Sequence, residues 1–134
     1  MLNKLASDFR FMQMYAHNAH NLIKGSTFFQ DHGFLGDLYP KYEEIYDSLI
    51  ERMLGLDEDI NLIEINDMAF QTLKKGGVTD DPQKIFTGLL HFEQYICHQI
   101  EDIKEQYSEG TRQMLGTIAD ESESRQYKLK QRIK

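Results

Sequence analysis

Apolar residues recur through this chain at alternating steps of three and four, the spacing that places them on one face of an α-helix. Four long segments show the pattern: residues 2–23, 38–53, 85–107 and 115–133. Gly25 follows the first segment, where a glycine commonly ends a helix. Pro40 lies at the start of the second segment, and proline suits the first turn of a helix. The sequence therefore predicts an all-α fold, in which the first helix ends at Gly25 and the second begins near Pro40.

The connections between these helices indicate which kind of bundle they form. Asp81 can cap the third helix and Pro82 can begin it, whereas Gly110 is expected to end it and Thr111 to cap the fourth. Between the second and third helices lies a shorter helical stretch, "NLIEINDMAFQTLKKGG", at residues 61–77. Four long helices with a helix-bearing connection between the second and third have the ferritin-like connectivity, and an up-down bundle is the alternative. We expect a ferritin-like four-helix bundle with a short crossover helix.

Length and cysteine content limit the domain number and the cellular setting. The chain has 134 residues and one cysteine, which suits a single domain over residues 1–134. Cys97 cannot form an internal disulfide, and no charged and then apolar leader opens the sequence, so a cytoplasmic location is expected. No apolar run approaches the length needed to span a membrane.

The net charge of −7 is unevenly distributed. Residues 38–110 are strongly acidic, whereas the last ten residues carry only basic charges: Arg125, Lys128, Lys130, Arg132 and Lys134. Nucleic-acid binding needs a positive surface, so only this end of the chain is a candidate for it. Cations at a helix C-terminus also complement the helix dipole, which is the simpler explanation.

Carboxylates and histidines form the strongest candidate for a site. Glu43, Asp47 and Glu51 follow one another at steps of four, so they lie along one helix face, where like charges repel unless a cation lies among them. A solvated acidic face is the alternative. His20 and His32 lie on either side of the first turn, and imidazole nitrogen with carboxylate oxygen is a ligand set that suits iron, manganese or zinc.

One chain does not obviously bring these groups together. If the first two helices fold back near residue 31, His20 lies level with about residue 42, which leaves Asp47 and Glu51 roughly 7 to 14 Å further along. A two-fold axis between two chains would bring the histidines of one chain to the carboxylates of the other, with two equivalent sites per pair. We therefore expect the nitrogen and oxygen donors to meet at a cation shared between subunits.

The spacing of these residues resembles that of the Dps mini-ferritins. The pattern that carries the resemblance reads His20, Gly25, His32, Asp47 and Glu51-Arg52. The likeness reaches the "GT" of residues 110–111 and the aromatic Tyr127. A local pattern also resembles small mini-ferritin-like proteins of tailed phages: His32, Leu35-Gly36, Tyr39, Asp47 and Glu51.

The resemblance implies an activity, a metal and an assembly. His20 and His32 of one chain, with Asp47 and Glu51 of its partner, would be the ligands of an intersubunit ferroxidase centre. That centre would lie in a dodecameric hollow shell that oxidises Fe(II) with peroxide or oxygen and stores the iron.

The chain departs from the family pattern at three places. Gly36 stands where the family has a further Asp, and Asp37 is the expected substitute ligand if the backbone near Gly33, Gly36 and Pro40 is irregular. Glu43 is the other candidate. Asn21 replaces the family's tryptophan, and the lysine-rich N-terminal arm is absent, so DNA binding by that route is not expected.

Other chemistry is less well supported. A di-iron site inside one bundle needs Glu-x-x-His on two helices, and the chain contains no such motif. His17 could assist His20, although a surface role is simpler. A partly exposed polar stripe is the simpler explanation for His91, His98, Glu101 and Glu105. Core packing is the simpler explanation for Tyr39, Tyr42 and Tyr46, and burial of a small residue is the simpler explanation for Cys97. A non-enzymatic scaffold or metal-binding module with an impaired iron site is the alternative function.

Overall fold

The computed structural model describes residues 2–134, and all the regular structure in that range is helical. The α-helices are α1 (Leu2–Leu22), α2 (Phe28–Gly55), α3 (Leu62–Gly76), α4 (Pro82–Ile103) and α5 (Glu109–Ile133), with a 3-10 turn, η1 (Lys104–Gln106), after α4. The chain divides into two compact units, residues 1–85 and 86–134. No helix within residues 2–134 is long and apolar enough to cross a membrane.

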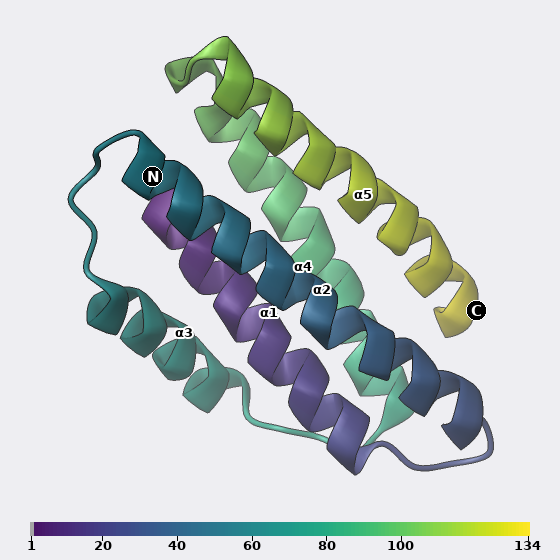
Figure 1. The fold of residues 1–134 in the computed structure, drawn as a ribbon. Helices are drawn as coiled ribbons and strands as arrows, with labels where there is room; N and C mark the ends of the chain where they lie inside the picture. The colour runs from purple at the N-terminus through teal and green to yellow at the C-terminus, as the bar shows by residue number, and fades with distance from the viewer. Residues whose placement is uncertain (1) are drawn as a thin grey trace. The chain divides into compact units, whose positions relative to one another are not determined.

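The first unit is built on an antiparallel hairpin of α1 and α2, with α3 lying alongside α1 (Figure 1). The apolar stripes of α1 and α2 are buried as the periodicity predicts, and their largest fully buried side chains include Phe9, Met12, Leu35, Tyr42 and Leu49. Polar contacts join the hairpin to α3. Asn66 accepts a hydrogen bond from Arg10 at 2.9 Å and donates one to the hydroxyl of Tyr46 at 3.1 Å.

The start of α2 differs from the prediction. α2 begins at Phe28 and contains Pro40 in its interior. Proline lacks an N–H, so residue 40 cannot donate to the carbonyl of Gly36. The helix continues because its apolar stripe continues through Pro40, with Leu35, Leu38 and Tyr42 all buried. Side-chain burial therefore outweighs the cost of one proline.

Replacing Pro40 with alanine is expected to raise the free energy of unfolding by about 1–2 kcal/mol. The substitution restores one helical hydrogen bond and removes a ring clash, which outweighs the greater flexibility of the unfolded chain. Urea unfolding at a fixed protein concentration measures the change. An unchanged or lower stability would show that the helix gains nothing from an N–H at this position.

Other helix ends follow local sequence signals. The side chain of Asn61 accepts a hydrogen bond from the Glu64 amide, and that of Asp81 accepts one from the Gln83 amide, both at 3.1 Å. The predicted crossover helix and the predicted cap at Asp81 are therefore confirmed. The predicted cap at Thr111 is wrong: α5 begins at Glu109 after Ser108, since the 3-10 turn ends the preceding helix early.

The loop after α1 contacts the loop before α4 within the first unit. Gly25 has φ of +123°, a conformation that residues with a side chain rarely adopt. The neighbouring Lys24 Nζ lies 2.8 Å from Asp80 Oδ2, and this hydrogen-bonded ammonium lowers the pKa of the Asp80 carboxyl. Both groups are exposed, so salt should weaken the pair.

The second unit holds a buried ion pair between α4 and α5. Glu93 is fully buried, and its carboxylate accepts hydrogen bonds from Arg125 Nε at 2.5 Å and Nη2 at 3.1 Å. Ser122 Oγ and Gln126 Nε2 donate to the Glu93 carbonyl at 3.2 and 3.4 Å. This network holds one face of α5 to α4.

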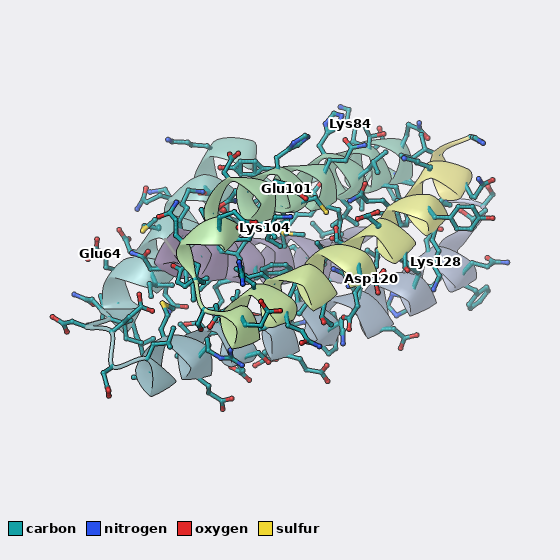
Figure 2. The ribbon with its side chains drawn as sticks, turned by 90° about the horizontal axis from the view of Figure 1, so that it is seen from above. Glu64, Lys84, Glu101, Lys104, Asp120 and Lys128 are labelled. Carbon is teal, nitrogen blue, oxygen red and sulfur yellow. The ribbon has the colours of Figure 1, made fainter. Side chains whose placement is uncertain are left out.

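The basic C-terminal segment is part of α5. Arg125 is engaged with Glu93, and the guanidinium of Arg132 lies 4.8 Å from the ring centroid of Phe86. Lys128 is exposed on α5 (Figure 2). Two of the five basic residues are thus held by their own unit, which weakens the case for a nucleic-acid surface.

Candidate metal centre

His20 and His32 form a reciprocal pair between the end of α1 and the first turns of α2. Their ring centroids lie 3.8 Å apart with planes 19° from parallel. His20 Nδ1 donates to the backbone carbonyl of His32, and His32 Nδ1 donates to the carbonyl of His20, both at 2.9 Å. The His20 carbonyl belongs to the last turn of α1, where helical donors run out.

These hydrogen bonds fix the tautomer of both rings. A carbonyl oxygen only accepts, so each Nδ1 carries the proton and each neutral ring keeps its lone pair on Nε2. Within residues 2–134, neither Nε2 has a hydrogen-bond partner, and both side chains are half-buried. Metal-binding histidines commonly donate their other N–H to a carbonyl in this way. The pair also closes the α1–α2 turn, which is its alternative, purely structural role.

Further aromatic rings stack on His32 and lie beside His20. Phe28 stacks on His32 with centroids 4.8 Å apart, and Tyr39 lies 5.5 Å from His20. His17 stacks on Tyr39 at 4.1 Å and 9°. The sequence did not predict this arrangement, although the helical spacing of Phe28, His32 and Tyr39 places them on one side of α2. Ring stacking limits the movement of both imidazoles.

The ring planes restrict how the pair can bind metal. An imidazole binds an ion along its lone pair, which lies in the plane of the ring. Because the two rings are 3.8 Å apart and only 19° from parallel, an ion in the plane of one lies outside the plane of the other. This arrangement favours neighbouring positions, one per imidazole, over a single ion held by both.

The expected carboxylates lie far from the histidines of the same chain. The backbone contacts place His20 level with His32, not with residue 42, because the turn between the helices is short and α2 starts at Phe28. At 1.5 Å per residue, Asp47 lies about 22 Å and Glu51 about 28 Å along α2 from His32. Both carboxylates are exposed. Within residues 2–134, no three His, Cys, Asp or Glu side chains gather to hold a metal.

The Gly36 region is regular helix. The backbone irregularity expected near Gly33, Gly36 and Pro40 is not found, because α2 is helical throughout. Asp37 therefore lies about 100° around the helix from Gly36 and is exposed. A Cβ on Gly36 would instead lie 3.0 Å from Cε1 of His20. Asp37 as a metal ligand remains a prediction without support from the backbone.

Comparisons with known proteins place the chain in a family. The family model of the ferritin-like domain matches residues 1–134, and the chain belongs to this family. The fold is similar to a Dps protein from Vibrio cholerae O1, a member of a broad superfamily of ferritin-like diiron-carboxylate proteins. The two structures share a TM-score of 0.88 and 24% identity over 99% of this chain and 86% of that chain.

A second solved structure, Helicobacter cinaedi CAIP, matches with a TM-score of 0.78 and 17% identity over 99% of this chain and 96% of that one. Comparison with curated proteins finds no match. The predicted all-α, ferritin-like fold class is confirmed, and so is the likeness to Dps at the level of the fold. The single domain over residues 1–134 and the ligand set stay predictions.

Proposed function

We propose that this chain is a mini-ferritin-type ferroxidase that oxidises and stores iron. Fe(II), the substrate, would bind to His20 and His32 of one chain and to Asp47 and Glu51 of a two-fold partner. The observation that carries this proposal is the reciprocal histidine pair, whose Nδ1 atoms are held by carbonyls and whose Nε2 atoms are left for a ligand. Membership of the ferritin-like family supports iron as the metal.

The length of α2 supports a two-fold arrangement. In an antiparallel pair of α2 helices, the residue on the axis lies midway between each pair of facing residues. The midpoint between His32 and Asp47 lies at residues 39–40, and that between His32 and Glu51 at residues 41–42. An axis near residues 40–42 is also the middle of α2, which spans Phe28–Gly55. About such an axis, the two ends of α2 would meet symmetrically in the same register as the proposed ligands.

Apolar side chains at both ends of α2 fit the same axis. At 100° per residue, Phe29 and Leu54 lie on the helix face that carries His32 and Asp47. Both are unusually accessible, at 85% and 56% exposure. Their midpoint again lies at residues 41–42, so Phe29 of one chain would face Leu54 of its partner. A second chain would bury both side chains beside each metal site.

The donor set suits ferrous iron chemistry. Imidazole and carboxylate ligands bind Fe(II) while leaving positions open for an oxidant. Each Fe(II) gives up one electron, and a peroxide accepts a pair of electrons with two protons to form water. One imidazole per ion, as the ring planes favour, would let each histidine hold its own Fe(II). The acidic stretch of residues 38–110 would attract further cations.

We further propose a cytoplasmic, hollow homo-oligomer, dodecameric in the family that the sequence resembles. The likeness to a Dps structure supports such an assembly. DNA binding is not part of the proposal, because two of the basic residues near the C-terminus are engaged within α4 and α5.

Wild-type protein is expected to form a large oligomer and to oxidise Fe(II) faster than buffer. Size-exclusion chromatography with light scattering measures the assembly, and absorbance of the ferric product measures oxidation after peroxide or air is added. A monomer or simple dimer would contradict the shell. Normal assembly with oxidation no faster than buffer would favour the alternative function, a ferritin-like scaffold with an impaired iron site.

A further inference from the structure

We propose that Gly36 is a positioning residue, because its missing side chain provides the space that the imidazole of His20 occupies. The packing of the His20 ring against Gly36 does not depend on the proposed function, whereas its effect on metal binding rests on that function. Gly36 lies one helical turn after His32 on α2. The sequence pattern alone indicated only a missing carboxylate at this position.

The distances show how closely the ring lies against the helix. An ideal Cβ built on Gly36 would be 3.0 Å from Cε1 and 3.3 Å from Nδ1 of His20. Contacts of 3.0–3.4 Å are tighter than nine in ten of those that real Cβ atoms make, so the neighbouring atom must give by a few tenths of an ångström. Any residue other than glycine at this position must therefore push the His20 ring or the backbone of α2 aside.

The His20 ring has no easy way to move. Its Nδ1 donates to the carbonyl of His32, its face stacks on the His32 ring, and Tyr39 lies against it. Shifting the ring away from α2 lengthens a 2.9 Å hydrogen bond and disrupts the stack. The tautomer that leaves Nε2 free depends on that hydrogen bond. Gly36 thus controls the orientation of a nitrogen donor through packing alone.

A side chain at position 36 would therefore shift the His20 ring from its observed position by a few tenths of an ångström. A carboxylate at this position would not complete the metal site of this chain, because it would displace a nitrogen ligand. The specific consequence is that Gly36→Asp should weaken metal binding, although it adds a ligand type that suits iron.

A double-mutant cycle tests the contact without any metal. Gly33→Ala is the matched control, since Gly33 lies in the same helix and a Cβ added there would meet nothing within 4 Å. Alanine stabilises an exposed helix relative to glycine, so Gly33→Ala should raise the melting temperature by about 3 °C. Gly36→Ala should instead lower it by about 3 °C. In the His20→Ala background, Gly36→Ala should raise it by about 3 °C, as the control does.

Two further measurements separate positioning from stability. In histidine ¹⁵N spectra, His20 should show the Nδ1-protonated form in the wild type and in Gly33→Ala, and lose it in Gly36→Ala. Titration calorimetry with Zn²⁺ should show affinity about tenfold lower in Gly36→Ala and Gly36→Asp, and unchanged in Gly33→Ala.

The outcomes distinguish this inference from the proposed function. Equal melting shifts for Gly36→Ala and Gly33→Ala in both backgrounds, with the His20 tautomer intact, would overturn the role of Gly36. Tighter Zn²⁺ binding by Gly36→Asp would also overturn it. A wild type that binds no Zn²⁺ would contradict the metal site, whereas the melting and tautomer results would still decide the Gly36 contact.

Discussion

About a quarter of the wild-type rate of Fe(II) oxidation should return when His20→Ala and Glu51→Ala subunits are unfolded together in equal amounts and reassembled. Each variant alone should be about tenfold slower than wild type or worse, because each lacks one direct ligand. In a mixed pair, one site combines both defects. The other site combines the intact histidines of the Glu51→Ala chain with the intact carboxylates of the His20→Ala chain. About half of the pairs are mixed, and one of the two sites in each is complete.

The matched control mixes His20→Ala with His32→Ala. Both substitutions affect the same half of the site, so every shared site keeps a defect and no activity should return. The assay is the initial rate of ferric absorbance at equal total subunit concentration. Recovery in neither mixture would contradict a site shared between chains, and equal recovery in both would contradict the assignment of the halves.

Arg125→Met should lower the free energy of unfolding by about 3–5 kcal/mol, the cost of removing one partner of a buried ion pair. Glu93 is fully buried, and Arg125 donates two hydrogen bonds to its carboxylate. Methionine fills a similar volume but takes away the positive charge beside a buried carboxylate. Urea unfolding at fixed protein concentration measures the loss.

Two comparisons isolate the buried charge as the cause. Arg112 pairs with Glu105 and Glu109 at the surface, so Arg112→Met should cost less than about 1 kcal/mol. The double variant Glu93→Leu/Arg125→Met should be more stable than Arg125→Met alone, because an apolar pair carries no unpaired charge. A double variant as unstable as the single one would show that packing, not charge, explains the loss.

Apolar spacing predicts most of the helices because burial of one face dominates helix formation in this chain. α1 and α3 follow the pattern, and Asp81 caps α4 where the sequence predicts. The start of α2 is not predicted, since local rules give Pro40 as a first-turn residue. The packing of Leu35 and Leu38, which depends on α1, decides where this helix begins.

The site is only partly predictable for a related reason. Residue types and spacing identify His20 and His32 as candidates, but which residues face each other depends on the length of the turn between α1 and α2. That turn ends at Phe28, so the carboxylates lie much further from the histidines than the sequence suggests. The contact between Gly36 and His20 depends on the same register. The position of a partner chain is not contained in the helical pattern of one chain.

The separation of the two ligand groups along α2 has a consequence for the stage of assembly at which iron oxidation can begin. Under the proposed arrangement, a newly made subunit carries an imidazole half-site and a carboxylate half-site that cannot reach one another. Iron oxidation, with its harmful oxygen by-products, would then begin only after subunits pair, inside the particle that stores the product. Assembly would regulate the chemistry without any separate inhibitor.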